Sequence, residues 1–308
     1  MKNQSLKSKK KILASQIAYK RGLNNENAMT RDIAKLFKQV SEEVQENLEE
    51  YWSDYQMLQG QINLITKPIL DAEEKYNSIL EKYIRRQYRL GSSEAERLVK
   101  QLTNRQAMKA DYGVRWKSNI TNITTTLRKK SKNLFGTLKD AEDELLEKTF
   151  TASKRTLARV TSQINQIITD GYTSGKGINI ISDMLQKRFN QLETWEAKRI
   201  ARTEIHNAHN NAVMRTYQSM NVEYTQWIAA SDDRTRDSHV EVDREIIPIG
   251  GTYSNGLQYP GDTSGPIEEW INCRCSNAPF VIPYGYMAPS FSPFREEDLV
   301  PIETNAPQ

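Results

Sequence analysis

The chain has 308 residues, of which 27% are charged and 37% hydrophobic, and its mean hydropathy is -0.72. No apolar run approaches the roughly 20 residues needed to cross a bilayer, which excludes a membrane-spanning helix and any expected membrane partner. The start also lacks the apolar stretch of a secretory signal, so we expect a soluble protein in the cytoplasm. The only cysteines, Cys273 and Cys275, are separated by a single residue, which excludes a disulfide scaffold.

The formal net charge of +4 is distributed unevenly. Residues 1–150 hold 28 Lys and Arg against 20 Asp and Glu, whereas residues 151–308 hold 15 against 19. Several lysines precede the first acidic residue, so residues 1–29 are predicted to form a basic arm on a phosphate backbone or an acidic protein surface. A solvated tail without a partner is the alternative. The lysines expected to contact DNA are Lys7, Lys9, Lys10 and Lys11.

Apolar residues follow at alternating steps of three and four from about Thr30, which predicts a helix over 30–58 with Thr30 as its N-cap. Gly60 and Pro68 are expected to bracket a break. A second helix is predicted from Ile69 to Gly91, with Gly91 as a cap of positive φ. The apolar stripe of the first helix consists of Ile33, Phe37, Val40, Val44, Leu48, Tyr51, Tyr55 and Leu58, and Tyr76, Tyr83 and Tyr88 of the second are assigned to the core.

Ser93 and Glu96 form a capping-box pattern that predicts a third helix, ending at Gly113. Over 114–130 helical spacing competes with a run of threonines, and we assign helix. A further helix is expected over 139–169, and the glycines at 171, 175 and 177 form a hinge-like loop. Residues 30–171 are therefore predicted to be a helical domain.

After this loop the pattern predicts a short helix around Leu185 and a longer one from Trp195 to Met220 with a stripe of small residues. Strand-like segments follow at 224–230, 240–249 and 278–282. The expected fold class is α+β: an extended, mostly helical N-terminal half, a smaller α+β domain over 178–283, and a Pro-rich extended tail over 284–308. Trp195, Trp227 and Trp270 are interpreted as the core of that domain.

The chain lacks a Walker loop, a dinucleotide fingerprint, HExxH and GxSxG, so mechanisms with strong local signatures are absent. One cluster remains, and its first interpretation is a structural zinc site with His239, Cys273 and Cys275 as ligands. His206, His209 or Asp237 are the candidates for the fourth position. No cofactor other than this zinc ion is expected.

Two other interpretations compete for the same cluster. In a nuclease, Glu204 and His239 would act as base and acid, with Arg202 or Arg236 stabilising phosphate charge. In a purely structural cluster, Arg202 would pair with the acidic loop at 232–237, and Glu204 with Arg234 or Arg236, while the cysteines would be small buried residues.

The order of these motifs resembles the Mu F-like minor head proteins, or head morphogenesis proteins, of tailed double-stranded DNA phages. The resemblance covers residues 150–283, and the helical half and the length look like the type found in siphophages of Gram-positive hosts. The motifs are Ala201-Arg202-Thr203-Glu204, the strand of Trp227 ending in Ala229-Ala230, the loop Asp232-Asp233-Arg234-Thr235-Arg236 with His239, and Asn272-Cys273-Arg274-Cys275.

The resemblance implies a non-enzymatic virion component that enters the procapsid in few copies, binds the portal protein and supports head assembly and DNA ejection. It would contact double-stranded DNA inside the phage head without sequence preference, after assembly in the host cytoplasm. Further partners would be scaffolding or major capsid protein, or a second copy through the N-terminal helices. A nuclease or toxin-like enzyme using Glu204 and His239 is the alternative.

Overall fold

A computed structural model describes residues 2–53, 57–110, 117–283 and 285–302, with side chains for 22–53, 57–102, 138–283 and 285–302. The chain divides into two compact units, each built from segments that are separated in the sequence. Unit 1 comprises Met1–Leu23, Arg85–Asp143 and Ile205–Gln308, and unit 2 comprises Asn24–Ile84 and Glu144–Glu204. The contiguous domains expected from the sequence remain a prediction.

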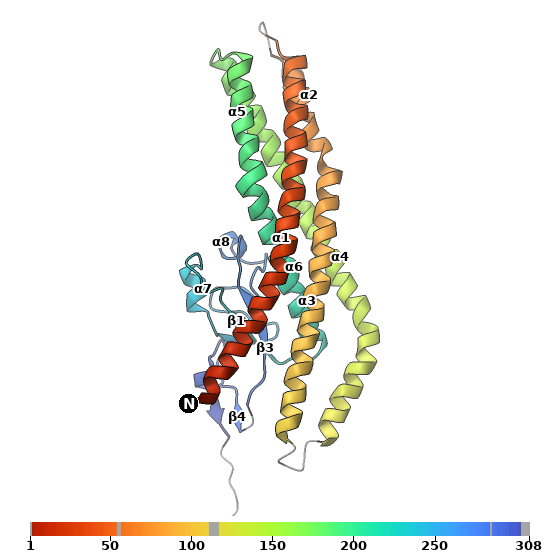
Figure 1. Cartoon of the computed structure of the whole chain (residues 1–308), viewed down its shortest axis with the longest axis vertical. Helices are drawn as coiled ribbons and strands as arrows, with labels where there is room; N and C mark the ends of the chain where they lie inside the picture. Colours follow the sequence, from red (N-terminus) through yellow and green to blue (C-terminus); the bar gives the residue numbers. More distant parts are fainter. Residues whose placement is uncertain (1, 54–56, 111–116, 284, 303–308) are drawn as a thin grey trace, which may run out of the picture. The chain divides into compact units, whose positions relative to one another are not determined.

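The element order confirms the α+β class, with long helices first and short strands near the end (Figure 1). The helical part consists of α1 (Lys2–Tyr51), α2 (Gln59–Asp71), α3 (Glu73–Ala110), α4 (Lys117–Thr173), α5 (Ile178–Gln191), the π-helix η1 (Leu192–Glu196) and α6 (Ala197–Ser219). The remainder consists of β1 (Tyr224–Ile228), α7 (Asp237–Glu241), β2 (Ile246–Pro248), α8 (Ile267–Trp270), β3 (Ser276–Phe280), β4 (Tyr286–Met287), the 3-10 turn η2 (Glu296–Asp298) and β5 (Val300–Pro301).

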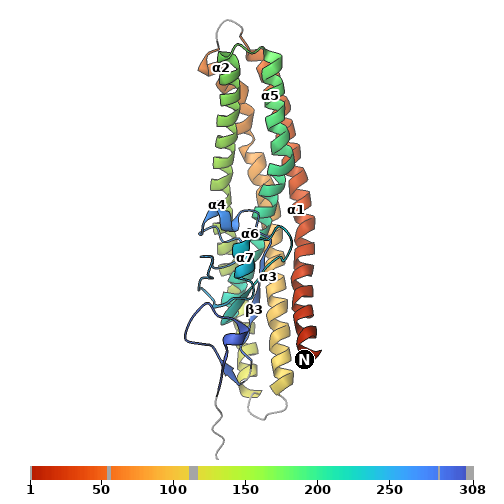
Figure 2. The same ribbon diagram turned by 90° about the vertical axis from the view of Figure 1, so that its left-hand side faces the viewer.

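Unit 2 is a bundle of helical segments in which the apolar stripes read from the sequence face inward. Figures 1 and 2 show its part of α1 running beside α5, where Ser182 donates a hydrogen bond to Gln45 at 2.6 Å. The rings of Phe37 and Tyr76 pack with centroids 5.9 Å apart. The stripe of α5 is confirmed, and that of α1 is confirmed as far as Leu48, since these members are buried: Ile33, Phe37, Val40, Val44, Leu48, Ile181, Leu185 and Phe189. The rest of the expected stripe is not, because Tyr51 is half-buried and Leu58 is 57% exposed, and Tyr55 lies outside the described residues.

Three expected helix boundaries in unit 2 are wrong, and the first is the end of the helix expected to reach Leu58, since α1 ends at Tyr51. Thr30 lies inside α1, where its hydroxyl donates to the Glu26 carbonyl at 2.7 Å instead of capping a helix. Pro68 lies inside α2, so the break precedes Gly60 instead of separating Gly60 from Pro68. A proline cannot bond the carbonyl four residues earlier. Here the Asn47 side chain donates to that carbonyl, on Leu64, at 2.9 Å, and the helix accommodates the proline.

The expected break at Gly91 is also wrong, because α3 runs through it without a left-handed residue. Ser93 and Glu96 therefore lie within α3 and do not open a new helix. A Cβ on Gly91 would stand 2.6 Å from the carbonyl oxygen of His209 on α6. Because Gly91 has no side chain, α3 can approach α6 closely within unit 1. Gly113, the expected end of this helix, lies outside the described residues.

Helix α4 confirms the helical assignment over 117–130 and extends past Gly171 to Thr173. Gly171 packs inside it against Ile181, whereas Gly175 has φ of +68° in the turn after the helix. The amide of Lys176 donates back to the Gly171 carbonyl at 3.0 Å, which closes the helix end. Of the three glycines in the expected hinge, Gly175 alone takes the left-handed conformation.

Unit 1 contains a three-stranded antiparallel sheet in the order β2-β1-β3. The segment 240–249 was expected to be one strand, but its first part belongs to α7 and only Ile246–Pro248 forms β2. Among the side chains of unit 1 that the structure describes, Trp227 is the largest buried one, and it packs edge-on against Tyr253, with ring centroids 5.1 Å apart. Its core cluster contains Trp227, Val242, Ile247, Tyr253, Leu257, Cys273 and Cys275.

The tryptophan core expected from the sequence is reduced to Trp227. Trp195 belongs to unit 2 and is 51% exposed, with the Arg199 guanidinium 4.8 Å from its ring centre. Trp270 in α8 is half-buried, and its indole nitrogen donates to the Gly265 carbonyl at 3.2 Å. The tyrosine assignments are confirmed, because Tyr76, Tyr83 and Tyr88 are all buried.

The Pro-rich tail is partly folded onto unit 1. Phe294 is buried in a cluster with Ile246 and Phe280, and its backbone exchanges two hydrogen bonds with Ile246 at 2.7 and 3.0 Å. Strands β4 and β5 then pair as a short antiparallel ladder. Among the residues that the structure describes, none of the helices combines the length and apolar character needed to cross a membrane.

Candidate functional site

The three motifs of the sequence cluster fall into both units. Arg202, Thr203 and Glu204 on α6 belong to unit 2, whereas the loop at 231–239 and the segment at 272–275 belong to unit 1. Within unit 1 the loop leads into α7, and the cysteines directly precede β3. The last two segments meet where His239 of α7 lies beside the cysteines. The candidate site is therefore built by unit 1, and the residues of unit 2 have separate surroundings.

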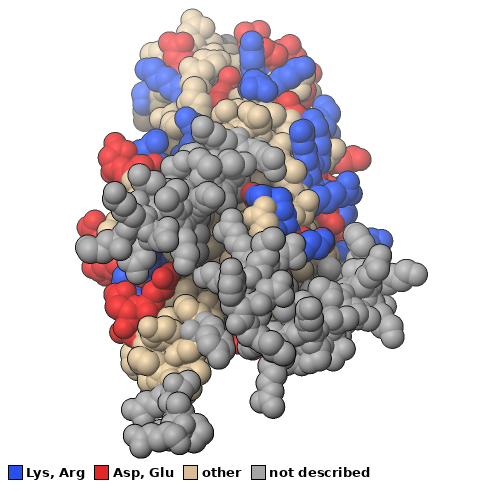
Figure 3. Space-filling view, turned by 60° about the horizontal axis from the view of Figure 1, so that its bottom comes forward, with Lys and Arg blue, Asp and Glu red and all other residues tan. Residues whose placement is uncertain are grey.

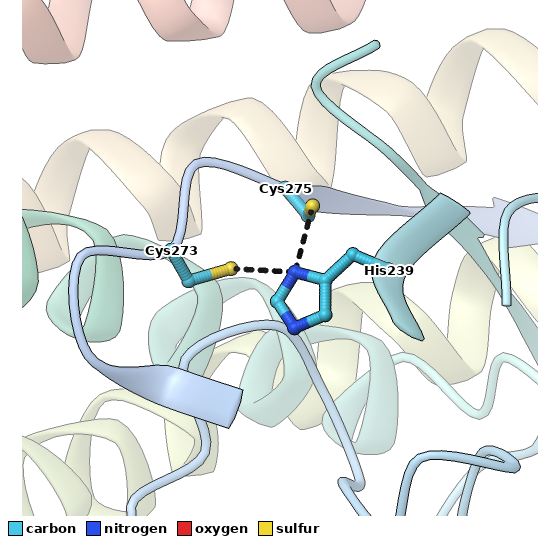
Figure 4. Close-up of side chains that lie close together, drawn as sticks. All are labelled: His239, Cys273 and Cys275. Atoms are coloured by element: carbon cyan, nitrogen blue, oxygen red, sulfur yellow. Dashed lines mark hydrogen bonds between the residues drawn. The ribbon is translucent and has the colours of Figure 1, made fainter. Parts of the chain in front are cut away.

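His239 and the two cysteines form a compact, buried group (Figure 4). The Nδ1 atom of His239 lies 3.4 Å from Sγ of Cys275 and 3.8 Å from Sγ of Cys273. All three potential ligand atoms lie within 4.8 Å of one another, and each side chain is at most 2% exposed. The ring of His239 is also packed edge-on against Trp227, with centroids 5.2 Å apart. The structure thus brings together the three residues that the sequence proposed as metal ligands.

The second ring nitrogen of His239 faces a carboxylate. Its Nε2 lies 3.1 Å from Oε2 of Glu269 in α8. The hydroxyl of Ser238 donates to the same carboxylate at 3.0 and 3.1 Å, which holds Glu269 beside the ring. A carboxylate at this distance favours the tautomer with its proton on Nε2, which leaves the lone pair of Nδ1 facing the sulfurs.

The two thiols have different acidities. A hydrogen bond with Cys275 lowers the pKa of Cys273 below its usual 9.0, burial opposes this, and Arg236 and Arg274 add to the lowering. The same bond and burial raise the pKa of Cys275 well above that value, although His239 opposes the rise. Cys273 is therefore the first of the pair to become a thiolate, the form that binds metal.

The loop preceding α7 is fixed by its own side chains and by the cysteine segment. The Asp232 carboxylate accepts bonds from the Arg234 amide and the Thr235 hydroxyl, both at 3.1 Å. Arg274, which lies between the cysteines, donates to the same carboxylate at 2.6 Å. Burial raises the pKa of Asp232, but these bonds and the Arg274 charge bring it below 3.8. Asp232 thereby ties the loop to the segment that carries both sulfurs.

Other motif residues have backbone roles or remain at the surface. Arg236 donates from Nη2 to the Ile271 carbonyl, a second tie between the two segments. Asn272 is exposed and takes a left-handed φ of +58°, which turns the chain just before Cys273. Arg234 is exposed and lies 3.9 Å from Asp232. Arg236 and Asn272 therefore shape the backbone around His239, whereas Arg234 lies at the surface.

Arg202 is engaged within unit 2 by a residue that the sequence did not suggest. Its Nε and Nη2 donate to one oxygen of Glu26, at 3.0 and 2.8 Å. Glu26 is 1% exposed and the Arg202 side chain 11%. The expected pairing of Arg202 with the loop at 232–237 is thus wrong. The sequence separation of 176 residues left no pattern from which the Glu26 partner could be read.

Glu204 lies two residues further along α6 and also has its partner within unit 2. Thr149 of α4 donates to its carboxylate at 3.2 Å, so the expected pairing with Arg234 or Arg236 is wrong. Burial raises the pKa of Glu204 from 4.5 to about 7, and the bond from Thr149 only partly opposes this. Thr203, between the two, donates from its hydroxyl to the Arg199 carbonyl at 2.9 Å.

The raised pKa of Glu204 predicts a measurable pH effect. The folded state retains this proton up to about pH 7, whereas the unfolded chain releases it near pH 4.5, so stability falls as pH rises through this window. Glu204→Gln should therefore stabilise the protein at pH 8, by about 3 kcal/mol. Urea unfolding at pH 4.5 and pH 8 measures this difference.

The matched control for this prediction is Glu46→Gln, which changes an exposed glutamate of α1 in the same unit. The control should shift the unfolding midpoint little at either pH. If the Glu204→Gln gain were equal at both pH values, the ionisation of Glu204 would not be its cause.

A pocket of about 310 Å³ adjoins the candidate site within unit 1. It is lined by Cys275, Asp232 and Arg274 on one side and by His206 and His209 of α6 on the other. Gln87 donates to Nδ1 of His209 at 3.1 Å, and burial lowers the pKa of His209 to about 4, so this ring is neutral at pH 7. His206, His209 and Asp237 do not join the group of His239 and the cysteines in the part of the chain that the structure describes.

The hydrolytic interpretation gains no support from these contacts. Glu204 lies in unit 2 and His239 in unit 1, and each is engaged within its own unit by other groups. The arginines assigned to phosphate are occupied as well, Arg202 by Glu26 and Arg236 by the Ile271 carbonyl.

The sequence matches one known protein family over part of its length. Residues 162–278 match the family described as Phage Mu protein F like protein. This part of the chain is similar to that family, and we call it the Mu F-like region. No curated protein and no solved structure matches the chain.

The match confirms the resemblance inferred from the motifs, over 162–278. The Mu F-like region contains α5, α6, β1, β2, the start of β3 and the group of His239, Cys273 and Cys275. The family is one of phage head morphogenesis proteins. Sequence reasoning missed Glu269, the carboxylate beside His239. It lies four residues before Cys273, and a carboxylate that close to a cysteine pair could have indicated a partner of the group.

Proposed function

We propose that this protein is a minor head protein of a tailed phage that binds the portal protein and enters the procapsid in few copies. It contacts packaged DNA without sequence preference and supports genome delivery, and its place is inside the phage head. The observation that carries the proposal is the match of residues 162–278 to the Mu F-like family. The host group, expected to be Gram-positive, is part of the same proposal.

A protein partner is supported by apolar side chains at the surface of unit 1. The segment after Pro283 exposes five large apolar residues, and three of them, Met287, Phe291 and Ile302, are more than half exposed. Several exposed large apolar residues within one short segment, part of which is paired as β4 and β5, are typical of protein contacts. The five residues, which we call the tail apolar surface, are Tyr286, Met287, Phe291, Val300 and Ile302.

The portal test uses the full chain and purified portal protein, both treated with nuclease. Co-elution on size exclusion is the expected result. The pair Met287→Ser and Phe291→Ser should weaken this binding at least tenfold, about 1.4 kcal/mol. The control pair, Leu64→Ser and Leu70→Ser, changes exposed leucines of α2 in unit 2 and should leave it unchanged. Absence of co-elution, or retention only by scaffolding or major capsid protein, would contradict portal binding.

The DNA contact is assigned to Lys7, Lys9, Lys10 and Lys11, whose side chains lie outside the described residues. On the described surface in Figure 3, Lys and Arg side chains stand among Asp and Glu side chains. A surface of mixed sign attracts phosphate less than a lysine-rich segment without acidic residues. The support for these four lysines is thus their position ahead of the first acidic residue.

Replacing these four lysines with glutamine should weaken binding to double-stranded DNA and reduce its salt dependence. Each lost phosphate contact lowers the slope of log K against log salt by about 0.9, so a change of about 3 to 4 is expected. Fluorescence anisotropy at several salt concentrations measures it. The control replaces Lys67, Lys100, Lys148 and Lys154, which are exposed and lie beside carboxylates. Sequence-selective binding that salt does not weaken would contradict the proposal.

A further inference from the structure

The group of His239, Cys273 and Cys275 has the geometry of a metal centre. With Zn–N near 2.05 Å and Zn–S near 2.3 Å, a tetrahedral ion places its nitrogen and sulfur ligands about 3.6 Å apart. The two distances from Nδ1 to Sγ in the structure are 3.4 and 3.8 Å, on either side of this value. Figure 4 shows Nδ1 directed at both sulfurs, as one shared ion requires.

Hydrogen bonds link these three atoms only in pairs, one between the two thiols and one between a thiol and Nδ1. A ring nitrogen offers either one lone pair or one proton, so Nδ1 bonds well with only one sulfur. Both sulfurs nevertheless face it, and both cysteines are free and buried. An ion placed among the three atoms contacts all of them at once.

The surroundings hold the three side chains in place before any ion arrives. Glu269 faces Nε2 of His239 at 3.1 Å, which is the arrangement of a carboxylate that orients a metal-bound histidine. The Asp232–Arg274 bond joins the loop before α7 to the cysteine segment. Cys275 also lines the adjoining pocket, which gives an ion a route to the group.

We propose that His239 through Nδ1 and Cys273 and Cys275 through Sγ bind one zinc ion that links α7 to the segment entering β3. Within the described residues no fourth His, Cys, Asp or Glu side chain joins the group. A water molecule therefore completes the tetrahedron. Thiolate and imidazole ligands favour zinc over the hard ions magnesium and calcium. The ion stabilises unit 1 by joining segments 34 residues apart in the sequence.

The test measures bound metal in the full chain purified without chelator. Elemental analysis should find about one zinc ion per chain, and Cys273→Ser with Cys275→Ser should remove it. His239→Gln should do the same, while the control His206→Gln, a half-buried histidine of α6 in unit 1, should retain one equivalent. Glu269→Gln should bind zinc 10 to 100 times more weakly in competition with a chromophoric chelator. This variant keeps all three ligands, so the result does not depend on a ligand variant folding.

Replacing zinc with Co²⁺ gives a second readout, because tetrahedral cobalt with thiolate ligands absorbs visible and near-ultraviolet light. The parent should show these bands, and the double cysteine variant should lack them. The proposal is overturned if the parent binds neither zinc nor cobalt after incubation with each ion. It is also overturned if the cysteine variant retains the parent stoichiometry, or if the thiols prove to be a disulfide that reductant alone opens.

Discussion

Replacing Arg202 with methionine is expected to lower the free energy of unfolding by about 3 to 5 kcal/mol, since it leaves a buried carboxylate without its cation. Glu26 is 1% exposed, and Arg202 reaches one of its oxygens with two N–H groups. Methionine fills much of the same volume, so the loss reports the missing charge more than a cavity. Urea unfolding followed by circular dichroism measures it.

The control for Arg202 is the double variant Arg202→Met with Glu26→Met. When both charges are removed from the interior of unit 2, most of the loss should be recovered, because the desolvation penalty of each charge disappears as well. If the double variant were as unstable as the sum of the two single variants, Arg202 would matter for its packing. The ion pair itself would then contribute little.

Replacing Gly91 with alanine should destabilise the protein by about 3 kcal/mol, although alanine is the better helix former. The new Cβ would lie 2.6 Å from the His209 carbonyl oxygen and 3.1 Å from the Cβ of Ala212. These atoms belong to the backbone and the short side chains of α6, which cannot rotate away. Unit 1 must separate α3 from α6 to accept the methyl group, and thermal unfolding measures the cost.

Gly60→Ala is the matched control for Gly91→Ala. Gly60 lies in the first turn of α2, and a Cβ there meets no atom within 4 Å. Alanine should therefore stabilise the protein by about 0.4 to 1 kcal/mol, through reduced freedom of the unfolded chain. The same Gly→Ala change is thus expected to lower the stability of the protein at Gly91 and to raise it at Gly60. A Gly91 variant as stable as the parent would show that α3 and α6 do not approach as closely as the structure indicates.

The sequence predicted best what depends on local periodicity and residue chemistry. The stripe of Ile181, Leu185 and Phe189 in α5 could be read because burial on a helix face repeats every three to four residues. His239, Cys273 and Cys275 could be grouped because few residue types bind soft metals. Neither inference required knowledge of distant contacts.

The errors arose where a distant contact overrides a local signal. Gly91 looked like a helix end, but α6 requires a residue without a side chain at that point. Pro68 looked like a helix breaker, but Asn47 from another helix satisfies the carbonyl that proline leaves unbonded. The Glu26 partner of Arg202 shares no sequence neighbourhood with it. Such pairings are decided by tertiary packing, and a single sequence carries no local signal for them.

The two backbone hydrogen bonds between Phe294 and Ile246 have a consequence for behaviour at high concentration. Strand β2 is an edge strand of its sheet, and its unpaired amide and carbonyl groups could pair with a strand from a neighbouring molecule. Phe294 occupies that margin and buries its ring beside it. Because these bonds cover part of the open side of β2, we expect that removing the C-terminal segment favours aggregation through strand addition.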